Sequence, residues 1–226
     1  MSRIVMAVGV FAIWAAGATW AEDLAVVELP APERDGGKPL MQALALRQSQ
    51  RAFAPDALSP QELANLLWAA CGVNRSESGK RTAPTAVNWQ EIDVYAALPQ
   101  GLYLYDAKTH KLLPVLDQDI RQAAGKQGFV RTAPVVLIYV SDHARMGRAG
   151  EKDRDFYSAT DTGFISQNVY LYCASAGLAT VVVGMVDKPA LEKTMGLRPD
   201  QKVILTQPVG RPSAPAPDAG NTGARP

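Results

Sequence analysis

The stretch that most restricts the fold is SATDTGFISQNVYLYCASA, residues 158–176, whose spacing predicts a long helix. Its apolar residues fall on nearly all sides of that helix. A helix of this kind is usually enclosed by other protein, either in the core of its own domain or at a contact between subunits. The rest of the chain, or a second copy of it, must therefore pack around this segment.

The segments around this helix alternate between strands and helices. Three apolar runs predict buried strands, at 133–142, 178–184 and 202–210, and the alternating segment 91–106 predicts a β-hairpin that turns at 99–101. Ser59-Pro60-Gln61-Glu62 forms a capping box that starts a helix ending at Gly72. Helices, a hairpin and then mixed strands and helices predict an α+β fold.

The first residues indicate export. A positive start, the apolar run 4–18 and small residues at 19–21 predict a Sec-type signal peptide over residues 1–21, and hence a periplasmic or secreted protein. Retention of this run as an uncleaved anchor is the alternative. No other stretch is long and apolar enough to span a membrane. We expect a linker at 22–37, one folded domain at 38–212 and a disordered Ala/Pro/Gly-rich tail at 213–226.

Composition and missing motifs exclude several classes of function. A formal net charge of +1 with scattered basic residues predicts no nucleic-acid binding. His110 and His143 lack a second ligand at metal spacing, so we expect no metal site. The chain has no G-x-S-x-G, no complete P-loop and no G-x-G-x-x-G. An enzyme of this sequence would therefore rely on a bound cofactor.

The two cysteines leave two interpretations open. Cys71 and Cys173 could form a disulfide in an oxidising compartment. Both also lie in apolar helical runs, where cysteine usually serves as a small buried apolar side chain.

Three polar side chains recur at every second residue just past the first predicted helix, 39–46. In an extended segment Arg47, Ser49 and Arg51 project from one side. Two guanidinium groups and a hydroxyl on one face make a grip for a phosphate, although solvated charges at a helix end are the alternative. The polar loop 74–90 is long for a compact domain, which is typical of a functional loop.

With these segments identified, the sequence resembles the nitroreductase-like FMN oxidoreductases from about Leu40 to Pro212. The resemblance rests on R-x-S-x-R at 47–51, on the pattern P-[ST]-[SA]-x-N-x-Q at 84–90, and on the helix at 158–176 with its Ala-Gly-Leu exit. The sequences of the segments 66–75 and 101–106 are most similar to those of the branch of azoline-oxidising (SagB-type) dehydrogenases. The resemblance implies a nitroreductase-like fold with a mixed or antiparallel central sheet flanked by helices. It also implies a homodimer with two FMN molecules at the subunit interface.

The resemblance further implies roles for matching residues. Arg47 and Ser49 are expected to hold the FMN phosphate, with Arg211 closing over it from the last strand. Arg51 is expected at the N1–C2=O2 edge of the isoalloxazine, where a fixed positive charge stabilises the reduced anion. Gly184, which follows Val183, is expected to let the backbone approach the flavin N5–O4 side. Arg51 and Gly184 are thus the expected catalytic positions, and the partner subunit is expected to supply the loop residues Pro84, Thr85, Ala86, Asn88 and Gln90.

Several of these positions have plainer interpretations. Asn88 and Gln90 could be amides that stabilise their own loop, and Gly184 could mark a tight strand exit. Tyr170 and Tyr172 favour interface packing over substrate contact. Trp89 could stack on the flavin or pack against the partner.

The sequence departs from the family pattern on the substrate side. Glu91-Ile92 stands where many members have Pro-Trp, and Val183-Gly184 replaces an acid–glycine pair.

We expect an exported FMN-dependent oxidoreductase that moves two electrons through flavin N5 by a ping-pong mechanism between small molecules. NAD(P)H is not expected outside the cytoplasm, and the sequence names neither the substrate nor the electron donor. A non-catalytic flavin-binding or accessory protein is the alternative.

Overall fold

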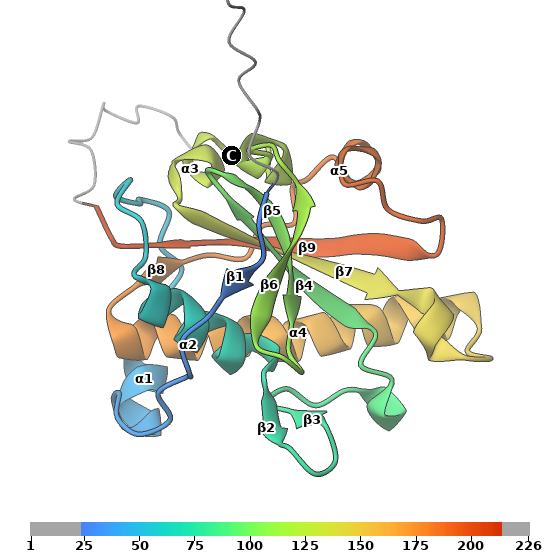
Figure 1. Cartoon of the computed structure of the whole chain (residues 1–226), viewed down its shortest axis with the longest axis horizontal. Helices are drawn as coiled ribbons and strands as arrows, with labels where there is room; N and C mark the ends of the chain where they lie inside the picture. The colour runs from blue at the N-terminus through green and yellow to red at the C-terminus, as the bar shows by residue number, and fades with distance from the viewer. Residues whose placement is uncertain (1–23, 214–226) are drawn as a thin grey trace, which may run out of the picture.

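A seven-stranded sheet forms the centre of the computed structural model, which describes residues 24–213 (Figure 1). The strands lie in the order β1-β6-β5-β4-β7-β9-β8, and every neighbouring pair is antiparallel. Their bounds are β1 Val27–Glu28, β4 Ile92–Leu98, β5 Gly101–Asp106, β6 Lys111–Leu116, β7 Val135–Asp142, β8 Ala179–Thr180 and β9 Gln201–Gly210. A separate hairpin joins β2, Val73–Arg75, to β3, Lys80–Arg81.

Helices cover both faces of this sheet. They are α1 Leu40–Leu46, α2 Pro60–Cys71, α3 Gly128–Thr132, α4 Glu151–Ala176 and α5 Lys188–Thr194, with short 3-10 turns η1 Ala86–Asn88, η2 Arg121–Ala124 and η3 His143–Met146. Figure 1 shows α1, α2 and α4 on one side of the sheet and α3 and α5 on the other. The α+β prediction is confirmed.

Local sequence signals account for the elements that carry the core. The Ser59 hydroxyl accepts a hydrogen bond from the Glu62 amide at 3.2 Å, and the Glu62 carboxylate accepts one from the Ser59 amide at 2.7 Å, so the predicted capping box starts α2. β4 alternates, with Val94 packed among the residues of α2 and α4 and Tyr95 packed toward α3 and α5. Every residue of β7 is buried, as predicted for a central strand.

The long helix α4 begins at Glu151, seven residues before the predicted start, and ends where Gly177 adopts a left-handed conformation with φ +71°. One side of it, with Ile165 and Val169, packs into the core. The other side leaves Phe156 63% exposed and Phe164 44% exposed. One chain therefore encloses only one side of α4.

The segment expected as a linker is part of the fold over its described residues. Residues 24–37 are largely extended, but β1 pairs with β6 and forms one edge of the sheet, with Val27 opposite Leu112. Leu24 and Leu29 also pack against the core, so apolar contacts hold the segment in place. The predicted signal peptide, residues 1–21, lies outside the described residues, as does all of the predicted tail except Ser213.

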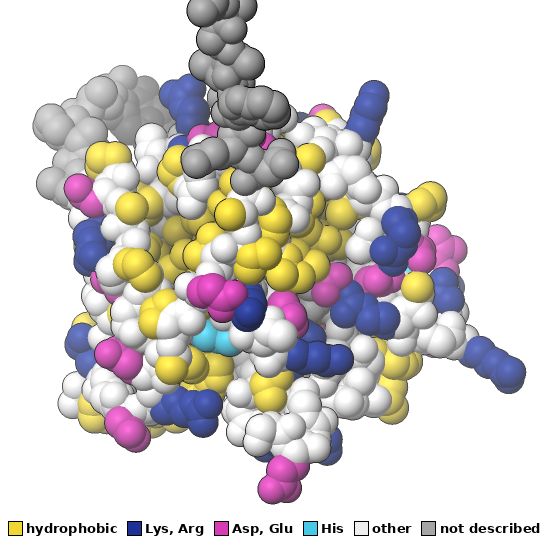
Figure 2. Space-filling model, in the orientation of Figure 1, with side chains coloured by type: hydrophobic (Ala, Val, Ile, Leu, Met, Phe, Trp, Pro, Cys, Tyr) yellow, Lys and Arg dark blue, Asp and Glu magenta, His cyan; other side chains and the backbone are white. Residues whose placement is uncertain are grey.

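Two further expectations concern the interior and the surface. Cys71 and Cys173 are both buried and free, and burial raises the pKa of the Cys71 thiol to about 11, as for small apolar side chains. On the face shown in Figure 2, Lys and Arg side chains are scattered rather than gathered. Within residues 24–213 no helix has the length and apolar character needed to cross a membrane.

Candidate functional site

The segment 47–51 leaves the helix where the sequence predicted. α1 ends at Leu46, and Arg47 has φ −58° and ψ 121°, which is outside the helical range. The Gln50 amide then donates a hydrogen bond of 3.0 Å to the Thr180 carbonyl, so the unwound segment runs beside β8. Among the described residues, neither Arg47 nor Arg51 forms an ion pair with a carboxylate. Both guanidinium groups are therefore available to an anion.

Tyr170 on α4 joins this segment to the strand exit that follows β8. Its hydroxyl lies 3.0 Å from Ser49 Oγ and accepts a hydrogen bond of 2.9 Å from the Val182 amide. The Arg47 guanidinium lies 5.5 Å from the centroid of the Tyr170 ring, within cation–π range. The sequence interpretation assigned Tyr170 to interface packing and missed this contact. A half-buried tyrosine hydroxyl usually has a polar partner, but its position along the helix does not identify that partner.

The backbone at the end of β9 lies near the segment 47–51, whereas the Arg211 side chain pairs with a carboxylate on α2. The Ala54 amide donates to the Arg211 carbonyl at 2.9 Å, which brings the end of β9 beside the segment that follows Arg51. The Arg211 guanidinium, however, donates to Glu62 Oε2 at 2.8 Å. In the single chain it thus pairs with the capping-box carboxylate at the start of α2.

After β8 the chain passes through Val183 and Gly184. Val183 pairs with the sheet, and Gly184 is exposed to solvent. Val183 pairs with Thr206 through two backbone hydrogen bonds of 2.8 and 3.1 Å. Gly184 is exposed, and a Cβ added there meets only the Leu205 side chain, at the ordinary contact distance of 3.7 Å. The packing of the chain itself does not require glycine at this position. A ligand at the open side would give a reason for it.

The loop 84–90 has an unusual backbone. Val87, Asn88 and Gln90 all have left-handed φ angles, at 41°, 60° and 51°, which few residues other than glycine adopt. Such strain persists only where surrounding contacts determine it, and it is common at functional sites. The Ala86 amide donates to Asp161 on α4 at 2.9 Å, and the Gln90 amide donates to the Thr85 hydroxyl at 3.1 Å.

The side chains of this loop differ in their hydrogen-bond partners and in their exposure. The Thr85 hydroxyl donates to Glu91 at 2.9 Å. The side-chain nitrogen of Gln90, Nε2, donates to the Gly79 carbonyl at 3.1 Å and to Asn88 Oδ1 at 3.2 Å. Gln90 thus stabilises its own loop, which supports the plainer of its two interpretations, whereas Asn88 is exposed. Trp89 packs edge-on against Tyr157 of the same chain, with ring centroids 5.6 Å apart.

A buried carboxyl group lies at the base of this loop. Glu91 is 0% exposed, and its Oε1 has no hydrogen-bond partner among the described residues. Burial, together with the neighbouring Asp161 carboxylate, raises the pKa of Glu91 to about 7, although the hydrogen bond from Thr85 acts in the opposite direction. Glu91 is therefore partly protonated near neutral pH.

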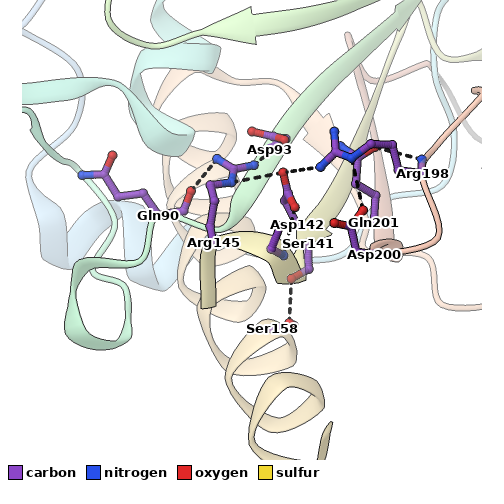
Figure 3. Close-up of polar contacts among 10 residues, drawn as sticks. Gln90, Asp93, Ser141, Asp142, Arg145, Ser158, Arg198, Asp200 and Gln201 are labelled. Atoms are coloured by element: carbon purple, nitrogen blue, oxygen red, sulfur yellow. Dashed lines mark hydrogen bonds and ion pairs between the residues drawn. The ribbon is translucent and has the colours of Figure 1, made fainter. Parts of the chain in front are cut away.

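An ionic network holds the exit of the loop to the sheet (Figure 3). Arg145 on η3 donates to the Gln90 carbonyl at 2.8 Å, pairs with Asp93 on β4, and lies 3.5 Å from Asp142 at the end of β7. Asp142 also accepts a hydrogen bond of 2.9 Å from Arg198. Arg145 was not identified from the sequence, because two of its three partners, Gln90 and Asp93, lie 55 and 52 residues away and only Asp142 is local.

The predicted site residues form two separate groups in one chain. The segment 47–51 meets α4 at Tyr170, whereas the loop 84–90 meets α4 at Asp161, which is about 13 Å away along the helix. We call these two groups half-sites, the segment 47–51 being the first and the loop 84–90 the second.

A family model described as "Nitroreductase family" matches residues 44–211. The chain belongs to the nitroreductase family. It is 32% identical over 183 residues to the Methanocaldococcus jannaschii protein named "Putative nitroreductase MJ1384", covering 76% of this chain and 90% of that protein. These matches identify the family and do not single out the azoline-oxidising branch.

Solved structures agree with this family assignment. A crystal structure of "a putative nitroreductase" from Ralstonia eutropha JMP134 superposes with a TM-score of 0.81 at 46% identity, over 84% of this chain and 90% of that chain. The NADPH:FMN oxidoreductase of Vibrio harveyi, complexed with NAD+, superposes with a TM-score of 0.59 at 18% identity. It covers 83% of this chain and 72% of that chain, and at this identity the likeness shows the fold alone.

Proposed function

We propose that this nitroreductase-family chain is an exported FMN-dependent oxidoreductase, which exchanges two electrons with small molecules in a ping-pong cycle. One observation carries the cofactor assignment. The unwound segment 47–51 presents two guanidinium groups that have no carboxylate partner within residues 24–213, beside the strand β8 that leads to the exposed Gly184. The guanidinium groups suit a dianionic phosphate, and the exposed glycine leaves room for a flat ring system close to that phosphate.

The residues of the first half-site have separate tasks in this proposal. Arg47 and Ser49 bind the phosphate of the cofactor, and Tyr170 holds both of them in position through its ring and its hydroxyl. Arg51 places a fixed positive charge at the pyrimidine edge of the ring. Gly184 leaves space for the cofactor and for the substrate that stacks on it. When bound, FMN supplies the hydride chemistry at its N5 atom.

A homodimer completes the site. α1 exposes Leu40 by 63% and Met41 by 75%, and Phe156 and Phe164 of α4 are exposed as well. Large apolar side chains exposed together on neighbouring helices support a subunit contact. The partner's loop 84–90 would then lie beside the segment 47–51 of the first chain, where the side-chain nitrogen of the exposed Asn88 could donate a hydrogen bond to the flavin.

The exposed backbone at Gly184 supports a ping-pong order, in which the electron donor leaves before the acceptor binds at the same place. Export is supported by the pattern of residues 1–21. A donor other than NAD(P)H is then needed, because nicotinamides are not expected outside the cytoplasm.

The test begins with the colour of the purified mature protein. It should carry flavin absorbance near one FMN per chain, and dithionite should bleach this absorbance reversibly. A colourless protein that cannot be reconstituted with FMN would contradict the proposal. Re-oxidation of the reduced protein by quinones or nitroaromatics should proceed with turnover, and the absence of turnover with any tested pair would favour a non-catalytic flavin-binding or accessory protein.

A further inference from the structure

A groove with a volume of about 390 Å³ runs between the β2–β3 hairpin and the loop 84–90. Three basic side chains line it, from Arg75, Lys80 and Arg81. The remaining lining residues are Ala83, Pro84, Thr85, Val87 and Asn88, and none of them is acidic. The groove thus combines several positive charges with no negative charge of its own.

The three basic residues have no carboxylate partner within residues 24–213. Glu77 is the one acidic residue in the hairpin sequence, and it does not line the groove. Like charges gathered on so short a hairpin repel one another, which a bound anion would relieve. Ordinary surface cations are more often scattered among acids, and this group is not.

The arginines of the groove are arranged to hold a ligand. Arg75 donates from Nε to Asn74 at 3.0 Å and from Nη2 to the Arg81 carbonyl at 2.8 Å, so its guanidinium is fixed while Nη1 remains for another acceptor. The Nε of Arg81 is buried and has no hydrogen-bond partner in the part of the chain that the structure describes. A buried donor without an acceptor is rare in folded proteins and calls for an explanation, which an acceptor supplied by a ligand would give.

The position of the groove relates it to the redox site. Pro84, Thr85 and Asn88 line the groove and also belong to the loop assigned to the flavin of the partner subunit. A molecule in the groove would therefore lie next to that flavin. All eight lining residues belong to the polar loop that the sequence singled out, residues 74–90.

We propose that this basic groove binds a carboxylate or phosphate group of the small molecule that exchanges electrons with the flavin. The inference rests on the proposed function and adds a class of substrate, a small organic anion. Arg75 can donate from its free Nη1 to an oxygen of such a group, Lys80 contributes a mobile point charge, and Arg81 contributes its unpaired Nε–H.

The binding test uses inorganic pyrophosphate as the probe, with calorimetric titration of the full mature chain. The double variant Arg75→Gln/Lys80→Gln should bind pyrophosphate about tenfold more weakly or worse. The matched control Lys108→Gln/Lys152→Gln removes the same charge from exposed positions outside the groove and should stay within about twofold of the wild type. Equal losses in both double variants, or no binding by the wild type, would overturn the proposal.

A second measurement identifies the source of the anion, because the flavin also carries a phosphate. The affinities of the groove variant for FMN and for riboflavin, which lacks the phosphate, should both match those of the wild type. Loss of the preference for FMN would assign the groove to the cofactor and overturn the substrate assignment. A wild-type chain that binds pyrophosphate through Arg75 and Lys80 but binds no flavin would support the anion site and contradict the proposed redox function, so the two failures are distinguishable.

Discussion

The hydroxyl of Tyr170 lies 3.0 Å from Ser49 Oγ, and the same hydroxyl accepts a hydrogen bond from the Val182 amide at 2.9 Å. A side chain on α4 thus sets the distance between the proposed phosphate-binding segment and the strand exit at Gly184. These two elements are far apart in sequence, and a flavin would have to contact both.

Replacing Tyr170 by Phe should weaken FMN binding by about two- to tenfold, because it removes the hydroxyl but keeps the ring under Arg47. The measurement is the quenching of flavin fluorescence on titration. Tyr172→Phe provides the control, since its hydroxyl donates to the Glu62 carbonyl at 3.3 Å and contacts neither segment. Equal affinities in the two variants would count against a positioning role for Tyr170.

Replacing Arg51 by Ala should lower the reduction potential of the bound flavin more than it weakens binding. The positive charge assigned to the pyrimidine edge stabilises the reduced anion more than the neutral oxidised ring. Spectroelectrochemical titration gives the potential, and fluorescence titration gives the affinity. A large loss of affinity at an unchanged potential would place Arg51 on the phosphate instead.

Replacing Arg145 by Lys should weaken FMN binding by about three- to tenfold at temperatures well below unfolding. The change keeps the charge near Asp93 and Asp142 but removes the planar group that holds the Gln90 carbonyl. Arg198→Ala is the matched control, because Arg198 pairs with Asp142 without touching the loop. If both variants bind FMN equally well, the network stabilises the sheet and has no part in the site.

The stability of the chain should depend on the protonation of Glu91. Its pKa is raised to about 7 from an ordinary value near 4.5, so the fold favours the neutral form. This contribution is fully present below pH 4.5 and is lost as the pH rises through 7. The melting temperature of the wild type should therefore fall between pH 5 and 8 by more than that of Glu91→Gln.

Differential scanning calorimetry over that pH range measures this effect. Glu77→Gln, which removes an exposed carboxylate from the β2–β3 hairpin, serves as the control and should keep the pH dependence of the wild type. Parallel curves for the wild type and Glu91→Gln would show that the buried carboxyl group does not titrate in this range.

The sequence predicted the elements whose signals are local. The capping box at Ser59, the hairpin of β4 and β5, the buried strand β7 and the end of α1 before Arg47 each depend on a few neighbouring residues. Their conformations follow from capping, alternation and apolar runs, which can be read without knowing the rest of the chain.

Contacts between distant residues could not be predicted in this way. Arg211 pairs with Glu62 across 149 positions, and Tyr170 reaches Ser49 across 121. β1 looked like a linker because its two residues gain stability only by pairing with β6. The left-handed conformations of the loop 84–90 likewise depend on Asp161 and Arg145, which fold against it from other elements.

The most direct test of the account compares the affinities of wild type and Arg47→Ala for FMN and for riboflavin. If Arg47 grips the phosphate, the variant should lose about tenfold or more in affinity for FMN, or about 1.4 kcal/mol, and should bind riboflavin as the wild type does. An unchanged affinity for FMN would place the phosphate elsewhere and contradict the assignment of the segment 47–51.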